Sequence, residues 1–125
     1  MKGLVFDGKR LTECKFEDSY KFLTDAVDGY IEHVVVPAFD SRRIDMWCNE
    51  EGKFRSDLET TLVLAHKHKQ YDYICGNIAF TRSTPDGETI GLTDEDIKFI
   101  KDKFADDGYV INPVLGMATQ LLEVV

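Results

Sequence analysis

The sequence predicts an α+β fold, with a mostly antiparallel sheet of five or six strands and two or three helices packed on one face. Three features indicate this class: a tight turn between two short β-patterned segments near the N-terminus, several runs rich in β-branched side chains, and two segments with helical spacing and capping residues. No repeat and no Pro- or Ser-rich linker interrupts the chain. We therefore expect one domain over residues 1–125.

The first segments predict a hairpin and then a helix. Residues 3–16 alternate imperfectly around Asp7-Gly8, and an Asp-Gly pair supplies the positive φ angles that a tight hairpin turn requires. A helix then begins at Asp18 or Ser19, because either side chain can cap it and the apolar residues that follow recur at steps of three and four. Gly29 is expected to end this helix.

The middle of the chain predicts two strands and one ambiguous segment. Residues 30–36 are rich in β-branched side chains and stop at a proline, which predicts a central strand. Residues 44–48 resume as a strand, and the turn at 49–53 predicts a second hairpin-like element. Within residues 57–69, helix and strand both stay open, because apolar residues at helical spacing alternate with β-branched ones; for 57–65 we favour a short helix.

The next part predicts a strand, a turn and the clearest helix of the chain. Residues 73–82 have the composition of a strand, with Gly76 marking a bulge or a close backbone approach. Residues 84–87 reverse the chain, and Thr93 then caps a helix whose first turn carries three acidic residues. Gly108 is expected to end that helix.

The C-terminal extension, residues 105–125, ends in an unusually apolar tail. Nine Val, Ile, Leu and Met side chains lie within residues 109–125. Such a tail either docks on the body of the protein or contacts another subunit. We expect a homo-oligomer that forms through residues 109–125.

Composition excludes several classes of protein and of partner. Hydrophobic residues make up 43% of 125 residues, while Gly and Pro number 9 and 3, which excludes disordered and collagen-like chains. The 15 basic and 23 acidic side chains give a formal charge of −8, which repels a phosphate backbone. We expect no direct nucleic-acid partner, and mimicry of DNA by the acidic surface is a minor alternative.

The cysteines and the apolar runs indicate a cytoplasmic protein without a membrane partner. The N-terminus lacks the features of a signal peptide, and the longest apolar runs, 34–36 and 62–65, are far too short to cross a bilayer. Cys14, Cys48 and Cys75 are odd in number and widely spaced, which favours reduced thiols over a disulfide framework.

No recognised motif points to catalysis, a metal or a cofactor. His66-Lys67-His68 lacks further donors nearby and is typical of a solvated loop, so we expect no metal there. His33 and Cys75 lie in separate predicted strands and are more typical of core or edge residues than of a nucleophilic pair. Because no Gly-rich phosphate motif occurs either, we expect no catalytic residue and no cofactor.

Arginines beside predicted turns are the best candidates for ligand contacts. Guanidinium groups grip phosphates and carboxylates, and Arg42, Arg43, Arg55 and Arg82 all lie in or next to turns. Trp47, next to another turn, is more typical of a core residue than of a recognition surface.

Three groups of residues resemble the DUF3846 family, a small uncharacterised family of bacteriophages, mobile elements and bacteria. They are Gly29-Tyr30-Ile31-Glu32, then Asn49-Glu50-Glu51-Gly52-Lys53, and then Gly76-Asn77-Ile78 with Asp86-Gly87-Glu88 and Gly91 to Ile97. The resemblance covers residues 1–104. It implies a viral or mobile-element accessory setting, in which small acidic proteins often bind a host component.

The function expected from the sequence is therefore non-catalytic binding that neutralises a host component. The partner would be a host defence protein or a small anionic signalling molecule. The speculative ligand-binding residues are Arg42, Arg43, Arg55, Trp47 and Asn77. The alternatives are a small hydrolase that uses a carboxylate or His33 in a cleft, and a structural or assembly protein that acts through its tail.

Overall fold

The computed structural model describes residues 1–111 and 116–125. In chain order the elements are β1 (Lys2–Phe6), β2 (Leu11–Lys15), α1 (Ser19–Val27), β3 (Ile31–Val34), α2 (Pro37–Asp40), β4 (Ile44–Asn49), the 3₁₀ turn η1 (Gly52–Phe54), β5 (Thr60–His66), β6 (Lys69–Cys75), β7 (Ile78–Ser83), β8 (Thr89–Ile90), α3 (Asp94–Asp107), β9 (Tyr109–Ile111) and β10 (Ala118–Glu123).

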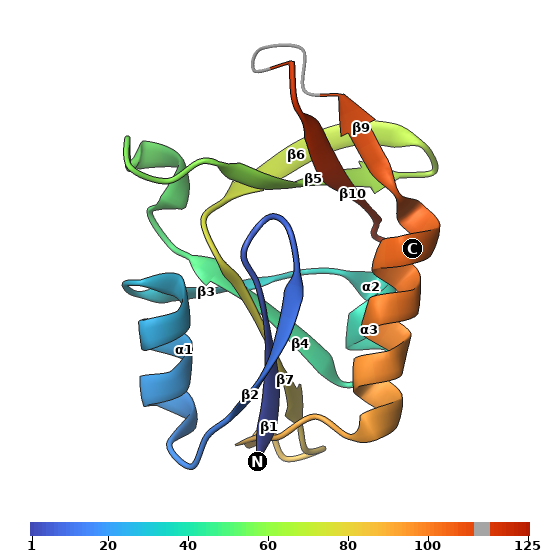
Figure 1. Ribbon diagram of the computed structural model, residues 1–125. Coiled ribbons are helices and arrows are strands. Elements are labelled where there is room, and N and C mark those ends of the chain that lie inside the picture. Colours follow the sequence, from blue (N-terminus) through green and yellow to red (C-terminus); the bar gives the residue numbers. More distant parts are fainter. Residues whose placement is uncertain (112–115) are drawn as a thin grey trace.

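A six-stranded antiparallel sheet forms the centre of the molecule (Figure 1). Its order is β2-β1-β7-β4-β3, with the short β8 paired to β7. The expected α+β class, with an antiparallel sheet of five or six strands, is confirmed. The hairpin turn at Asp7 is confirmed as well, because its carboxylate accepts hydrogen bonds from the N–H groups of Lys9 and Arg10, both at 2.9 Å.

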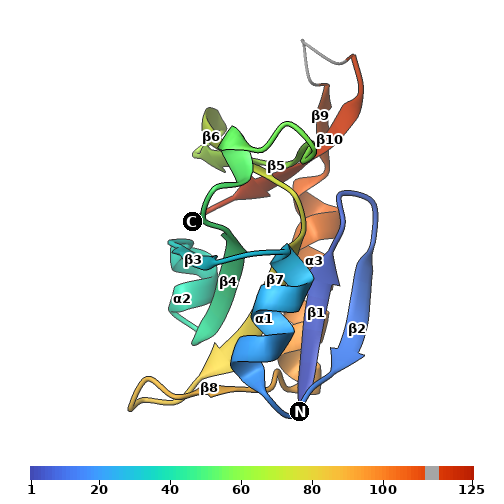
Figure 2. The same cartoon turned by 90° about the vertical axis from the view of Figure 1, so that its left-hand side faces the viewer.

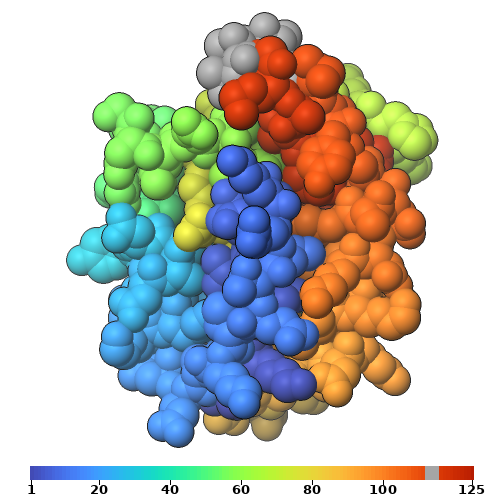
Figure 3. Space-filling view, in the orientation of Figure 1, coloured from blue at the N-terminus to red at the C-terminus, as the bar shows by residue number. Residues whose placement is uncertain are grey.

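Helices cover both faces of this sheet, so the expected packing of the helices on one face is wrong. The helices α2 and α3 pack on one face, where Phe39, Phe80 and Phe104 belong to the main hydrophobic core. The helix α1 covers the opposite face, with Leu23 and Val27 against β7. Figure 3 shows the β1–β2 hairpin filling the front of the molecule between α1 and α3.

Local capping explains where the two longer helices begin. Asp18 is the N-cap of α1 and accepts a hydrogen bond from the Lys21 N–H, which decides between the two expected caps. Thr93 and Asp96 form a reciprocal capping box at the start of α3. Gly108 ends α3, as expected.

A second, four-stranded sheet packs over one end of the first, and the sequence analysis did not anticipate it. Its order is β6-β5-β10-β9, in which β10 runs parallel to β5 and the other pairs are antiparallel. Leu62, Leu64 and Leu122 from this sheet share one core with Leu4 and Phe80 of the first. Both sheets therefore bury their apolar faces in the same interior.

The expected short helix at residues 57–65 is wrong, because this segment becomes the central strand β5. β5 pairs with β6 on one side and with β10 on the other, and it buries Leu62 completely. A strand enclosed in this way has apolar residues on both faces, so its sequence imitates helical spacing. The β-branched side chains of the segment were the better indicator.

Three other expectations need correction. The strand expected within 30–36 is an edge strand, not a central one, because β3 ends the strand order with β4 as its neighbour. Val36 lies beyond the strand and is buried at the start of α2. The strand at 44–48 has no hairpin partner after the turn at 49–53; β4 pairs with β3 and β7 instead. Residues 73–82 form parts of two strands in different sheets, broken at Gly76, whose φ of 84° suits glycine.

The apolar tail docks on the body through β9 and β10, which is one of its two expected placements. Leu122 and Val124 are buried in the core. The tail residues Val114 and Leu115 lie outside the described residues. Homo-oligomerisation stays a prediction. Among residues 1–111 and 116–125, no helix has both the length and the apolar character needed to cross a membrane.

Candidate functional site

A cleft of about 530 Å³ lies where the two sheets meet, between the β3–β4 pair and the β5–β6 pair. β3 and β6 are each the edge strand of their sheet, and β6 lies above β3 in Figure 2. The lining of the cleft includes the buried residues Leu64, Ile74 and Cys75. The volume is in the range of pockets that hold a small ligand or a few side chains of a partner.

The walls of the cleft combine acidic side chains with exposed aromatic rings. The lining contains three acidic residues, Glu32, Glu50 and Asp72, and one lysine, Lys53, which is paired with Asp72. Three aromatic residues of the lining stay open to solvent: Phe54 (89% exposed), Tyr71 (55%) and Tyr73 (43%). Large apolar side chains left this exposed at the edge of a concave surface are typical of a binding site.

Lys53 shows how the cleft holds a cation. Its ammonium nitrogen is paired with the Asp72 carboxylate and lies 4.6 Å from the centre of the Tyr73 ring. The hydrogen bond to Asp72 raises the pKa of Lys53. Carboxylate on one side and aromatic face on the other are the two groups that attract an ammonium or guanidinium.

Cys48 lies in the lining but is not poised as a nucleophile. Burial, with a smaller contribution from the nearby Glu32 carboxylate, raises the pKa of its thiol to about 12. The Sγ atom lies 3.9 Å from Oε2 of Glu32. Because the thiolate is the reactive form, this cysteine stays a neutral thiol near pH 7.

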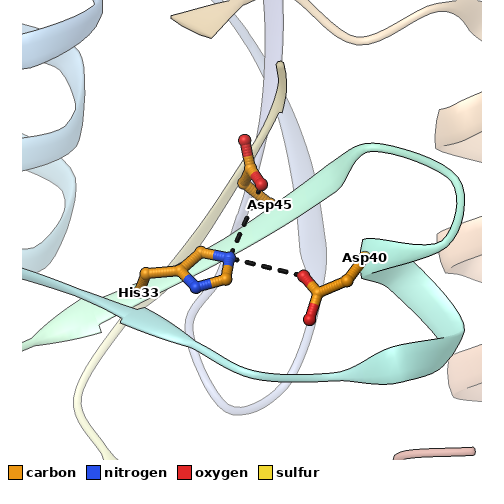
Figure 4. Close-up of side chains that lie close together, drawn as sticks. All are labelled: His33, Asp40 and Asp45. Atoms are coloured by element: carbon orange, nitrogen blue, oxygen red, sulfur yellow. Dashed lines mark ion pairs between the residues drawn. The ribbon is translucent and has the colours of Figure 1, made fainter. Parts of the chain in front are cut away.

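A cluster of three ionisable side chains lies beside the cleft, and Figure 4 shows them converging from β3, α2 and β4. His33, which also lines the cleft, places Nε2 at 3.4 Å from Oδ1 of Asp40 and 3.5 Å from Oδ1 of Asp45. Burial raises the pKa of Asp45, while Ser83 and His33 oppose that rise. The sequence analysis had considered His33 with Cys75 and as the catalytic group of a small hydrolase, but not together with Asp40 and Asp45.

The predicted arginine Arg55 is occupied by carboxylates of its own chain. It donates hydrogen bonds to Asp57 and Asp28 and to the Asp28 backbone oxygen. The bond to Asp57, followed by that to Asp28, raises the pKa of Arg55. Asn77 lies at the same end of α1 and donates to the Ala26 carbonyl at 3.2 Å. Both residues support the local structure there.

The other predicted arginines lie near the start of α3. Arg82 donates to both oxygens of Asp96, and the Arg42 guanidinium lies 3.9 Å from the centre of the Phe99 ring. Arg43 is exposed in the turn before β4, with φ of 61°. The arginines therefore fall into two groups, one at the C-terminal end of α1 and one near α3.

Trp47 packs in the smaller hydrophobic cluster under α1 and donates its Nε1–H to Thr81 at 2.9 Å. This placement agrees with the core interpretation of the only tryptophan. It also gives the protein a fluorescent reporter between α1 and the sheet.

A family model described as a domain of unknown function, DUF3846, matches residues 1–105. The chain belongs to the DUF3846 family. No curated protein and no solved structure matches it. The match to DUF3846 takes in the whole six-stranded sheet and nearly all of α3, and it leaves β9 and β10 outside.

Three of the segments that carried the resemblance to DUF3846, 29–32, 49–53 and 76–78, meet at the C-terminal end of α1, whereas 86–88 and 91–97 lie in the turn before β8 and at the start of α3. Asn49 donates to the Val27 and Asp28 carbonyls at 3.0 and 3.2 Å and accepts from the Glu51 N–H at 2.8 Å. A side chain at Gly52 would approach the Cys75 carbonyl oxygen to 2.9 Å. These motif residues hold the helix, η1 and the end of β6 together, so their role is structural.

The cleft itself escaped the sequence analysis because its walls come from separate segments. Glu32 lies on β3, Lys53 and Phe54 lie on η1, and Asp72 and Tyr73 lie on β6, so two edge strands from different sheets and a 3₁₀ turn form these walls. A useful signal was the pair of tyrosines in the polar segment before Cys75, where aromatic rings alternate with charge. Only the docking of the two sheets turns that alternation into one wall of a cleft.

Proposed function

We propose that this DUF3846 protein is a non-catalytic binding protein whose cleft holds a positively charged segment of a partner protein. In the viral or mobile-element setting that the resemblance implies, the partner would be a host protein that this binding neutralises. The acidic surface of the chain would speed the encounter with a basic partner, because its formal charge is −8.

The observation that carries the proposal is the position of Lys53 against Asp72 and the Tyr73 ring. A lysine or arginine of a partner would find the same carboxylate and ring, with Glu32 and Glu50 nearby in the lining. The exposed ring of Phe54 would cover the apolar part of that side chain. Lys53 therefore competes with the cationic side chain of the partner for Asp72 and the Tyr73 ring.

A small anionic signalling molecule, the other expected ligand, finds less support. Three carboxylates line the cleft, and Arg55 and Arg82 are paired with carboxylates elsewhere. Bringing an anion to these walls would oppose like charges. Of the two expected partners, we therefore retain the host protein.

The test uses a fluorescein-labelled decapeptide of alternating lysine and arginine and a control peptide of aspartate and glutamate, followed by fluorescence anisotropy. We expect the basic peptide to bind and Lys53→Ala to tighten its binding, because the variant frees Asp72 and the Tyr73 ring. The gain should be about 3- to 30-fold, since an exposed cation–π contact is worth about 0.5–1 kcal/mol and an exposed ion pair about 0.2–1 kcal/mol. Phe54→Ala should weaken binding by about 3-fold.

Matched variants separate the cleft from the overall charge. Lys98→Ala removes the same charge from α3, where Lys98 is paired with Asp102. Tyr109→Ala removes an exposed ring from β9. If Lys98→Ala strengthens binding as much as Lys53→Ala, the peptide is responding to net charge and the proposed cleft is wrong.

A further inference from the structure

Nε2 of His33 lies too far from the oxygens of Asp40 and Asp45 for good hydrogen bonds, at separations close to those of two donors on one metal ion. Nε2 of His33 lies 3.4 Å from one carboxylate oxygen and 3.5 Å from the other, beyond the range of about 2.7–3.2 Å for N–H···O bonds. Two donors on a tetrahedral Zn²⁺ with bonds of about 2.0–2.1 Å are separated by about 3.3–3.4 Å. All three donor atoms lie within 4.8 Å of one another.

Contacts outside the cluster already orient its side chains. Oδ2 of Asp40 accepts the Val36 N–H at 3.0 Å, which turns Oδ1 towards His33. The rings of His33 and Trp47 pack edge to face, with their centres 5.4 Å apart. Such outer contacts hold metal ligands in place before the ion arrives.

The three ligands come from elements that the fold brings together and holds. β3 pairs with β4, and the short α2 connects them. The Asp45 side chain is mostly buried, at 15% exposure, while His33 and Asp40 keep 35% and 31%. Two carboxylates at this spacing repel each other without a cation, and the exposed side leaves a path for an ion and for water.

We propose that His33, Asp40 and Asp45 bind one Zn²⁺ ion, with water as the fourth ligand. An imidazole with two carboxylates suits a borderline transition ion, whereas Ca²⁺ takes six to eight oxygen ligands and Mg²⁺ prefers an all-oxygen octahedron. The ion joins β3, α2 and β4 beside the cleft. His33 also lines the cleft, but neither Lys53 nor Phe54 takes part in this metal site, so different variants test the two proposals.

One other group of the chain competes for the ion in any binding experiment. Nδ1 of His68 lies 3.2 Å from Oε1 of Glu123, and His66 is nearby in sequence. The His68 side chain is almost fully exposed, and it shares only one carboxylate. The experiment must therefore assign the ion to His33 and not to His68.

The test is isothermal titration of Zn²⁺ into the full chain after treatment with a chelator. We expect one ion per chain, with affinity lowered at least 10-fold by His33→Ala and by Asp45→Asn, because loss of outer-shell partners alone costs 10- to 100-fold. The matched control is the double variant His66→Ala/His68→Ala, which should keep the site. Folding of each variant is followed by the fluorescence of Trp47.

A second measurement needs no variant. Co²⁺ added to the wild-type chain should shift the imidazole proton signals of His33 in NMR spectra and give the strong visible bands of a four-coordinate ion. Absence of binding would overturn the proposal. So would Co²⁺ shifts confined to His66 and His68, or Zn²⁺ affinity that survives His33→Ala.

Discussion

Asn49→Ala should destabilise the protein strongly, because one side chain makes several hydrogen bonds. The Asn49 side chain is buried and makes three hydrogen bonds, two to the last carbonyls of α1 and one from the Glu51 N–H. Each hydrogen bond is worth about 1 kcal/mol net, so the loss of three should lower the free energy of unfolding by about 3 kcal/mol. That is a large part of the stability of an ordinary domain.

Urea unfolding followed by Trp47 fluorescence measures this loss. With a denaturant dependence of about 2 kcal/mol per molar urea, 3 kcal/mol moves the midpoint down by about 1.5 M. The matched control is Asn77→Ala at the same end of α1. Its exposed side chain makes one bond, of 3.2 Å to Ala26, and its loss should cost about 0.5 kcal/mol. If the two variants unfold at the same urea concentration, the three-bond argument is refuted.

Three further predictions follow from single contacts. Asp96→Ala should lower the free energy of unfolding by about 3 kcal/mol, because it removes the carboxylate partner of Arg82 and the capping box of α3. A loss below about 1 kcal/mol in thermal or urea unfolding would contradict this. Cys14 should react with a thiol reagent at pH 8 well before Cys48, whose burial raises its thiol pKa to about 12, and equal rates would contradict the buried position. Hydrogen bonds from two backbone N–H groups lower the pKa of Asp7 in the folded state below its ordinary value of 3.8. The Asp7 carboxylate therefore stabilises the fold above that pH, and this contribution is lost as the pH falls through the folded-state pKa. The melting temperature of Asp7→Ala should therefore lie below that of the wild type at pH 7, by an amount that shrinks towards pH 2.

The predictions that succeeded rest on local interactions. The Asp7-Gly8 turn, the Asp18 cap and the Thr93 capping box each depend on residues within three or four positions of one another. Such contacts form from the nearby sequence whatever the rest of the chain does. The α+β class followed from the same signals.

The predictions that failed concern strands whose partners are distant in sequence. β5 was taken for a helix because its partner β10 begins more than fifty residues later and encloses it on one side. Segment composition indicates that a strand can form but not with which strand it pairs. For the same reason the sequence analysis missed the second sheet and placed residues 30–36 at the centre of the first.

The sequence by itself determined the hairpin at Asp7-Gly8, the starts of α1 and α3, the end of α3, the net acidic charge and the membership in DUF3846. Only the tertiary structure placed Lys53 between Asp72 and Tyr73, and His33 between Asp40 and Asp45. It also paired Arg55 and Arg82 with carboxylates of the chain itself, so these two guanidinium groups are already occupied. The physical reason is that a binding site depends on which charges face each other across packed elements, and that is decided when the sheets dock.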